Sequence, residues 1–210
     1  MQIKSKGTFI SFEGIDGSGK STQIKKVREL LRNYNKNIIF TREPGGTKES
    51  ELIRNLILKP NIDINFEDKT EILLLLAARY EHFKKLIQPE ILKGSVIVCD
   101  RFIDSTLAYQ CSNKALKDFY LYVSKELIYD FQPDLTILLD ISPSDAIKRI
   151  NNRKVKNRYD SKDLKYFQKV RKNYLELAKK NKKIIKLSAS KNENILAEEI
   201  KEVILKSISQ

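Results

Sequence analysis

Short apolar runs alternate with stretches of helical periodicity along most of the chain. Five runs rich in Ile, Val and Leu predict strands at residues 8–12, 37–41, 95–99, 135–140 and 183–187. Their nearly continuous apolar character is typical of strands that are buried on both faces. Between them, apolar residues recur every three or four positions. This spacing predicts helices around 24–34, 72–87, 164–177 and 196–204.

Alternating strands and helices favour one class of fold. They predict right-handed βαβ units, which build a parallel sheet covered by helices on both faces. We therefore expect an α/β protein of three layers around a five-stranded parallel sheet. Because ligands bind outside the carboxyl ends of the strands in such sheets, the residues after each strand are the first candidates for a site.

The length and composition favour one globular unit. At 210 residues, with 41% hydrophobic and 32% charged residues, the chain is expected to form a single domain, 1–210. The one markedly polar and irregular segment, 151–163, lies between two predicted helices. We interpret it as a mobile loop.

The chain is strongly basic, with 40 Lys and Arg against 27 Asp and Glu and a net charge of +13. This balance permits interaction with nucleotides, nucleic acids or acidic membranes and does not choose among them. Because the lysines are scattered along predicted helical faces, we interpret the excess as a solvated surface and expect no nucleic-acid partner.

The compartment is predicted from cysteines and from hydrophobicity. Cys99 and Cys111 do not have the spacing of a metal or redox motif. No apolar segment approaches the ~18 residues of a membrane span, and the N-terminus does not resemble a leader peptide. We expect a cytoplasmic protein without a membrane partner.

A glycine-rich segment joins the first predicted strand to the first predicted helix. It consists of Gly14, Ile15, Asp16, Gly17, Ser18, Gly19, Lys20 and Ser21, followed by Thr22. The order matches the phosphate-binding loop GxxxxGK[ST] in the structural context that this motif requires. Backbone N–H groups and Lys20 attract phosphate oxygens, and the Ser21 hydroxyl can bind Mg²⁺. The loop predicts ATP or GTP with magnesium and leaves the phosphate acceptor open.

Charged pairs follow the other predicted strands. Asp100 and Arg101 end the third strand, where a carboxylate suits magnesium and a guanidinium suits phosphate. A purely structural ion pair is the alternative. Arg42 and Glu43 follow the second strand, so Arg42 and Arg101 are expected to converge on one anion. Asp140 ends the fourth strand and is interpreted as a carboxylate at a helix start.

Two further titratable residues lie in the helix predicted at 72–87. Arg79 has apolar neighbours, so its guanidinium needs a partner, either a ligand or a salt bridge at the edge of the core. His82 is the only histidine. We interpret it as structural, because phosphoryl transfer depends on positioning and charge neutralisation more than on a base.

Four segments in this order, FEGIDGSGKSTQ, TREPGGT, LAARYEHF and DRFIDSTLAYQ, resemble the thymidylate kinases, which are nucleoside monophosphate kinases. The resemblance spans nearly the whole chain, and DRFIDSTLAYQ is its most specific part. It implies a P-loop NTPase fold with a short lid at about 149–162. It also implies a homodimer that uses Mg²⁺ and ATP to convert dTMP to dTDP, supplying dTTP for DNA synthesis.

The resemblance implies roles for the residues at the strand ends. Arg42 and Arg101 would bind the dTMP phosphate, and Asp16 the 3′-hydroxyl of the deoxyribose. Arg79 would hydrogen-bond the thymine edge. Glu43 would lie near the sugar and the magnesium shell.

Further roles fall on the DRFIDSTLAYQ segment and on the first strand. Thr106 and Gln110 would close on the base, and Tyr109 would lie against the sugar and disfavour a 2′-hydroxyl. Ser105 completes the implied substrate-binding set, and Glu13 is a catalytic candidate.

The resemblance also implies a catalytic arginine. One branch of the family has an Arg directly after the loop aspartate, whereas this chain has Gly17 there and resembles the branch that supplies the charge from the lid. Arg149, Arg153 and Arg158 are the candidates. Arg153 is preferred because it lies in the irregular segment 151–163. Lys20 is a catalytic candidate as well.

Two positions depart from the family pattern and affect the fit of the base. Leu75 stands where the family often has an aromatic residue, and Cys111 where a glycine is usual. A kinase for another monophosphate such as dUMP therefore remains an alternative. A second is a nucleotide-switched ATPase that binds nucleic acid, for which the TLAYQ segment has no purpose.

Overall fold

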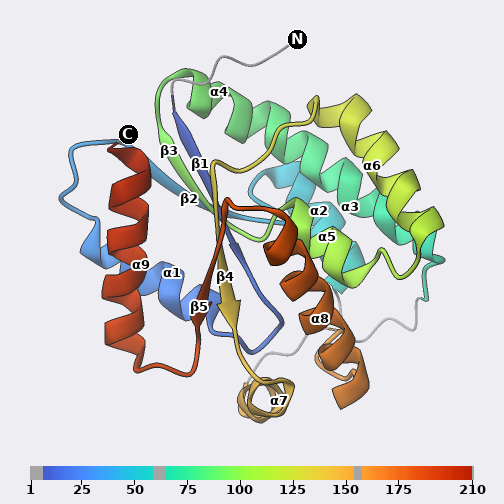
Figure 1. Cartoon of the computed structure of the whole chain (residues 1–210). Helices are drawn as coiled ribbons and strands as arrows, with labels where there is room; N and C mark the ends of the chain where they lie inside the picture. The colour runs from blue at the N-terminus through green and yellow to red at the C-terminus, as the bar shows by residue number, and fades with distance from the viewer. Residues whose placement is uncertain (1–6, 59–64, 154–157, 210) are drawn as a thin grey trace.

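The computed structural model describes residues 7–58, 65–153 and 158–209, and its centre is a parallel sheet of five strands (Figure 1). These are β1 (Thr8–Glu13), β2 (Ile38–Arg42), β3 (Val96–Asp100), β4 (Leu135–Asp140) and β5 (Ile184–Ser188). Their order across the sheet is β2-β3-β1-β4-β5. Each predicted strand is confirmed, with its ends shifted by at most one residue.

Helices cover both faces of the sheet. On one side, α1 (Lys20–Leu30) packs against α9 (Glu193–Ile208). The other side carries α3 (Asp68–His82), α5 (Ile103–Tyr109), α6 (Lys114–Ile128) and α8 (Leu164–Lys180). The remaining helices are α2 (Lys48–Leu58), which packs on α3, α4 (Gln88–Leu92), which follows a π-helical turn at Phe83–Ile87, and α7 (Pro143–Asn151). The three-layer α/β architecture is confirmed.

Alternation along β1 and β3 distributes their side chains between two buried clusters. Successive side chains of a strand point to opposite faces of a sheet. Ile10 and Val98 accordingly pack in the cluster that includes side chains of α1 and α9 and extends to α8. Phe9 and Ile97 pack in the cluster that α3 and α6 cover. Strands buried on both faces produce the apolar runs seen in the sequence.

Several helices lacked a clear apolar period in the sequence. In α2 only Ser50 and Ile57 are buried, because the helix lies over α3 at the periphery. In α6 the buried positions include Tyr120 and Ser124. Polar or amphipathic residues on a buried face weaken the period from which helices are predicted.

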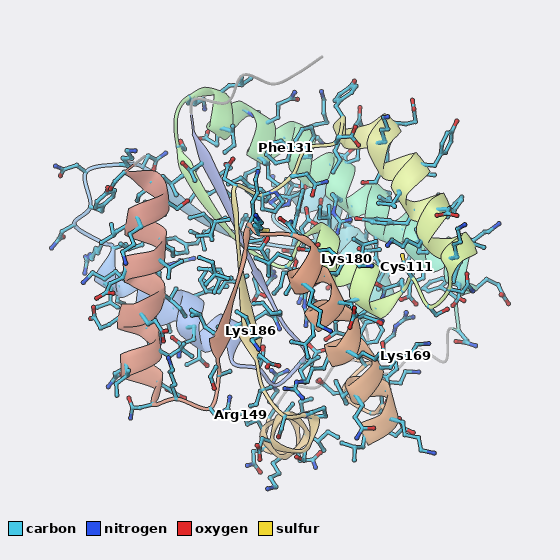
Figure 2. All side chains as sticks on the ribbon, viewed as in Figure 1. Cys111, Phe131, Arg149, Lys169, Lys180 and Lys186 are labelled. Carbon is cyan, nitrogen blue, oxygen red and sulfur yellow. The ribbon has the colours of Figure 1, made fainter. Side chains whose placement is uncertain are left out.

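The described surface carries many of the excess lysines. Figure 2 shows Lys169 and Lys180 on α8 and Lys186 on β5, and all of these side chains are exposed. No helix in the described ranges is both long and apolar enough to span a membrane.

Candidate active site

Two adjoining cavities lie at the carboxyl edge of the sheet, where the fold leads us to expect ligands. The smaller cavity has a volume of about 110 Å³. The larger one has a volume of about 830 Å³ and borders the phosphate loop through Lys20. Their shared wall includes Asp16, Glu43, Arg54 and Arg101. The two cavities therefore meet along a wall of charged side chains.

The phosphate loop depends on glycines whose backbone is left-handed. The φ angles are 141° at Gly14, 82° at Gly17 and 88° at Gly19. A Cβ on Gly17 would lie 2.4 Å from the carbonyl oxygen of Ala146, so a side chain is sterically excluded there. The loop ends at the first turn of α1, and free backbone N–H groups at a helix N-terminus attract phosphate. The predicted loop has the local structure needed for a nucleotide.

Lys20 is buried within this loop. Its Nζ donates to the carbonyl oxygens of Gly14 at 2.9 Å and Ile15 at 3.1 Å. Burial, reinforced by the charge of Arg101, lowers the pKa of Lys20 to about 8, although nearby carboxylates act in the opposite direction. A phosphate beside this ammonium would stabilise its charged form.

The two predicted magnesium ligands lie side by side. Ser21 Oγ donates to Asp100 Oδ2 at 3.1 Å, which joins the first turn of α1 to the end of β3. Mg²⁺ prefers oxygen ligands and commonly takes only one or two from the protein, with phosphates and water completing its shell. Ser21 and Asp100 therefore fit a magnesium ion at the loop. Thr22, the last residue of the predicted loop, is exposed on α1.

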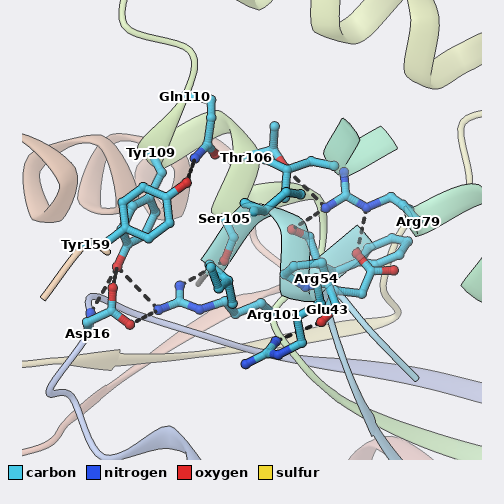
Figure 3. A pocket seen from close by; sticks show the side chains of 15 residues that line it. Asp16, Glu43, Arg54, Arg79, Arg101, Ser105, Thr106, Tyr109, Gln110 and Tyr159 are labelled. Atoms are coloured by element: carbon cyan, nitrogen blue, oxygen red, sulfur yellow. Dashed lines mark hydrogen bonds and ion pairs between the residues drawn. The ribbon is translucent and has the colours of Figure 1, made fainter. Parts of the chain in front are cut away.

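Arg101 holds the shared wall together (Figure 3). Its backbone is left-handed, with φ of 72°, which is uncommon for a residue other than glycine and occurs often at functional sites. Nη2 donates to Asp16 Oδ1 at 2.8 Å, and Nη1 donates to Ser105 Oγ at 3.1 Å. The Tyr109 hydroxyl donates to the other oxygen of Asp16 at 3.0 Å. We call Asp16, Arg101 and Tyr109 the Asp16 cluster.

Charge balance keeps Asp16 ionised. Burial alone would raise the pKa of Asp16, but the positive charges of Arg101 and Lys20 outweigh burial and lower that pKa. The carboxylate is thus available as a hydrogen-bond acceptor at neutral pH.

Glu13, a predicted catalytic residue, lies outside both cavities and is fully buried. Its carboxylate accepts from Phe102 N at 2.7 Å, Ser105 Oγ at 2.6 Å and the Tyr174 hydroxyl at 2.9 Å. Burial raises the pKa of Glu13, against these hydrogen bonds and Arg101. Its contacts support the residues around Arg101, and they bring the carboxylate to neither cavity.

Arg79 is almost wholly buried and lines the smaller cavity. Its Nε donates to Glu43 Oε2 at 2.7 Å, and its Nη2 donates to Thr106 Oγ1 at 3.1 Å (Figure 3). The salt bridge that we weighed against a ligand contact is therefore present. The same guanidinium also forms part of the cavity wall, so the ligand contact stays a prediction.

His82 contacts the carboxylate oxygen of Glu43 that Arg79 does not contact. It is fully buried, with Nδ1 3.0 Å from Glu43 Oε1 and Nε2 2.8 Å from Thr41 Oγ1. Burial would raise the pKa of Glu43, but Arg79 and His82 outweigh burial and lower that pKa. His82 has the structural role that we expected of it.

Two arginines extend the larger cavity. Arg42 is 54% exposed and forms a bidentate pair with Glu51 at 2.9–3.2 Å. Arg54, which the sequence patterns did not indicate, lines both cavities and donates to the Pro44 carbonyl oxygen at 2.7 Å. Arg42, Arg54 and Arg101 all line the larger cavity, as do Arg28 and Arg153, and the convergence of Arg42 and Arg101 on one anion stays a prediction.

One face of α5 lines the smaller cavity. Ser105, Thr106 and Tyr109 share this face, and Gln110 follows at its end (Figure 3). This grouping follows from helical spacing, since residues three or four apart lie on one side. Ile57, Leu58 and Leu75 add aliphatic side chains to the lining of this cavity. Cys111 lies outside the lining residues, and its Sγ is 3.9 Å from the carbonyl oxygen of Leu116.

The three predicted lid arginines lie in different surroundings. Arg149 belongs to α7 and donates to the Ala189 carbonyl oxygen at 3.0 Å, near the carboxyl ends of β4 and β5 (Figure 2). Arg153 lines the larger cavity and has its Nη1 3.7 Å from Asp160 Oδ1, whereas Arg158 pairs with Glu71 of α3. Residues 154–157 of the predicted lid lie outside the described residues.

The interpretation of Asp140 as a helix-start carboxylate was wrong. Ser142 caps α7, with its side chain accepting from Asp145 N at 3.2 Å. Asp140 instead accepts from Arg171 Nε of α8 at 2.7 Å. Ser142 takes the cap because it directly precedes Pro143, the first residue of the helix.

Comparisons with known proteins agree on one family. The family model for thymidylate kinase matches residues 12–200. The thymidylate kinase of Mesoplasma florum is 42% identical over 203 residues, covering 95% of this chain and 96% of its own. That of Buchnera aphidicola subsp. Schizaphis graminum is 41% identical over 210 residues, covering 99% and 98%. A crystal structure of thymidylate kinase from Ehrlichia chaffeensis superposes with a TM-score of 0.74 at 31% identity, covering 95% of this chain and 98% of that one. The chain therefore belongs to the thymidylate kinase family.

Proposed function

We propose that this chain transfers the γ-phosphoryl group of ATP to dTMP at the wall shared by its two cavities. The products are ADP and dTDP, a precursor of dTTP for DNA synthesis. One observation carries the proposal: the cavity at the phosphate loop and the cavity around α5 share Asp16 and Arg101. A donor in one and an acceptor in the other would have their phosphates close together, and such proximity lowers the barrier to transfer.

The phosphate of dTMP would lie against the arginines of the shared wall. Arg101 and Arg54 line both cavities, and Arg42 lines the larger one. Guanidinium groups match phosphate oxygens in a bidentate geometry. Binding of phosphate to Arg42 competes with Glu51, which holds that side chain in the structure.

The nucleoside of dTMP would occupy the smaller cavity. Asp16 would accept from the 3′-hydroxyl, and Tyr109 would lie against the sugar where a 2′-hydroxyl would otherwise fit. Arg79 would hydrogen-bond the thymine edge, and Thr106 would close on the base. Arg79 Nη2 and Thr106 Oγ1 are 3.1 Å apart. Leu75 would contact the base by aliphatic packing.

The remaining predicted site residues complete this acceptor site. Ser105 positions Arg101 by its hydrogen bond of 3.1 Å, and Glu43 fixes Arg79. Glu13 Oε2 accepts a hydrogen bond from Ser105 Oγ at 2.6 Å and so holds Ser105 in place. Gln110 would close on the base.

Transfer would rest on charge neutralisation. The loop backbone and Lys20 would hold the β and γ phosphates, and Ser21 and Asp100 would hold Mg²⁺, which neutralises charge on those oxygens. Arg153, which lines the same cavity, would stabilise the transferring phosphoryl. An arginine in this role contributes on the order of 10³ to 10⁵ in rate in related P-loop enzymes. Closure of the segment around 149–162 would exclude water and favour transfer over hydrolysis.

We further infer a homodimer formed through α2, α3 and α6. Large apolar side chains are exposed on each of these helices: Leu52 and Leu56, Leu73 and Tyr80, Leu121 and Tyr122. Contiguous exposed apolar surface marks interaction sites, and two identical patches pair by twofold symmetry. Sedimentation at micromolar concentration should give twice the chain mass, and Leu52→Glu should give the chain mass. A monomeric wild-type chain would contradict this interface.

We infer a single domain, because both buried clusters pack on the same sheet. We also infer a cytoplasmic location. Both cysteines are free thiols in the structure, and free thiols persist in a reducing compartment.

The acceptor is tested by a coupled assay of ADP formation with Mg-ATP. The acceptors are dTMP, dUMP, UMP and dGMP, with a reaction lacking acceptor as control. We expect ADP formation to depend on dTMP and to be much slower with every other acceptor. Equal rates with and without acceptor, or stimulation by polynucleotide in place of dTMP, would refute the proposal.

A further inference from the structure

Glu71 is a carboxylate on the first turn of α3 for which the phosphoryl transfer described above has no role. Its Oε1 accepts from Gln110 Nε2 at 2.8 Å and from the Tyr159 hydroxyl at 2.6 Å, and its Oε2 accepts from Arg158. These donors come from the end of α5 and from residues 158–159, so one side chain joins three parts of the chain. We call these four residues the Glu71 cluster.

The Glu71 cluster forms part of the wall of the smaller cavity. Gln110 and Tyr159 both line that cavity. The Tyr159 ring packs edge-on against Tyr109, with ring centroids 6.0 Å apart. Tyr109 in turn contacts Asp16. A change at Glu71 is therefore connected to the residues that would surround the nucleoside.

The ion pair within the cluster is partly buried. The side chains of Glu71 and Arg158 are 13% and 20% exposed. Arg158 also packs over the Phe66 ring, with its guanidinium carbon 5.8 Å from the ring centroid. Removing one partner from such a pair leaves a poorly solvated charge, so the two residues should be energetically coupled.

Resting on the proposed function, we propose that Glu71 is a positioning residue that fixes Gln110 and Tyr159 beside the base and keeps Arg158 at that end of the site. Arg158 is then not the arginine that stabilises the transferring phosphoryl. Arg153, which lines the cavity of Lys20, Ser21 and Asp100, is the preferred candidate for that role, and Arg149, which lies beside Gly19 of the phosphate loop, is the alternative. The cluster separates the two arginines by function, one for holding the acceptor and the other for transfer.

The test is a double-mutant cycle of Glu71→Gln and Arg158→Met, with Glu67→Gln as control. Glu67 is exposed and lies one turn earlier, at the start of α3, so its substitution changes the charge at the same helix end. We expect each variant of the pair to raise KM for dTMP on the order of tenfold. KM for ATP and kcat should stay within about threefold, a split that general destabilisation would not produce. The KM for dTMP of the double variant should be no higher than that of either single variant.

Three kinetic results would overturn the proposal. The first is a double variant whose fold increase in KM for dTMP equals the two single increases multiplied together. The second is an increase for Glu71→Gln that is no larger than that for Glu67→Gln. The third is a fall in kcat on the order of 10³ for Arg158→Met with dTMP affinity unchanged, which would assign Arg158 to the phosphoryl group.

Hydrogen exchange without nucleotide separates this proposal from the proposed activity. Amides of residues 158–162 should exchange faster in Glu71→Gln than in wild type or Glu67→Gln. Unchanged exchange would overturn the Glu71 cluster even in an active kinase. A wild-type chain without dTMP-dependent ADP formation would instead refute the proposed function, whatever the exchange result.

Discussion

Asp16 and Arg101 form an ion pair, with 2.8 Å between Oδ1 and Nη2, on the wall shared by the two cavities. Asp16 belongs to the phosphate loop, whereas Arg101 follows β3 and has a left-handed backbone. The pair thus joins the residues proposed for the donor to those proposed for the acceptor. Its side chains are 14% and 17% exposed, so solvent screens the interaction less than at the surface.

Tyr109→Phe tests the Asp16 cluster. The substitution removes a hydroxyl that donates to Asp16 at 3.0 Å and leaves the ring in place. A hydrogen bond to a charged group contributes about 1.5–3 kcal/mol, so kcat/KM for dTMP should fall at least about tenfold. Steady-state kinetics check this, with Tyr129→Phe as control because Tyr129 is 53% exposed and directly follows α6. Equal kinetics for both variants would disprove a role for the hydroxyl.

Lys20 should make ATP binding depend on pH. Its pKa is lowered to about 8 by burial, and bound phosphates would raise it again. Binding above pH 8 must therefore take up a proton, and the ATP affinity should fall by up to about tenfold per pH unit. Below pH 7, Lys20 is already charged and should add no pH dependence. Calorimetry in buffers of different ionisation enthalpy measures the uptake, and its absence at pH 9 would rule out this account of Lys20.

Asp104 should destabilise the fold as the pH rises from about 4 to 7. It is buried on α5, and burial, assisted by the charge of Glu13 and opposed by Arg79, raises the pKa of Asp104 to about 7, against 3.8 for the free side chain. Between about pH 4 and 7 the unfolded chain loses this proton while the folded chain keeps it, so stability falls across that window.

Asp104→Asn should remove that penalty. The free energy of unfolding of the variant should increase relative to that of wild type as the pH rises, by at most about 4 kcal/mol at pH 8. Urea unfolding at pH 5 and pH 8 measures the difference, with exposed Asp118→Asn as control. A difference between variant and wild type that is the same at both pH values would be inconsistent with the raised pKa.

Arg153→Met should slow transfer and leave binding nearly intact. The side chain lines the larger cavity and is 41% exposed, and its Nη1 lies 3.7 Å from the buried carboxylate of Asp160. If Arg153 stabilises the transferring phosphoryl, kcat should fall on the order of 10³ or more, with KM for both substrates within about threefold. Lys148→Met, 77% exposed on α7, is the control. A kcat close to that of the control would exclude Arg153 from this role.

Local sequence patterns predicted the strands and the phosphate loop well. Each of these elements is a continuous run of residues whose periodicity or glycine content reflects its own backbone. The sequence alone was enough to expect Lys20, Ser21 and Asp100 at one site, because the carboxyl ends of parallel strands share one edge.

Residues placed by tertiary packing could not be predicted in this way. Arg54 lies on a helix with little buried surface, and only its spacing of three from Glu51, the partner of Arg42, could have indicated it. Glu71 meets Arg158 across 87 residues of sequence, and no motif connects them. Asp140 was misassigned because its partner, Arg171, comes from a helix that packs beside the strand.

Transfer to dTMP is measured by following the γ-phosphoryl group of ATP. The chain is incubated with γ-labelled ATP, Mg²⁺ and dTMP, and the label is resolved into dTDP and inorganic phosphate. Transfer within a closed site predicts that nearly all of the released label appears in dTDP and that little release occurs without dTMP. Release as inorganic phosphate, at the same rate with and without dTMP, would show that this chain hydrolyses ATP and does not transfer the group to dTMP.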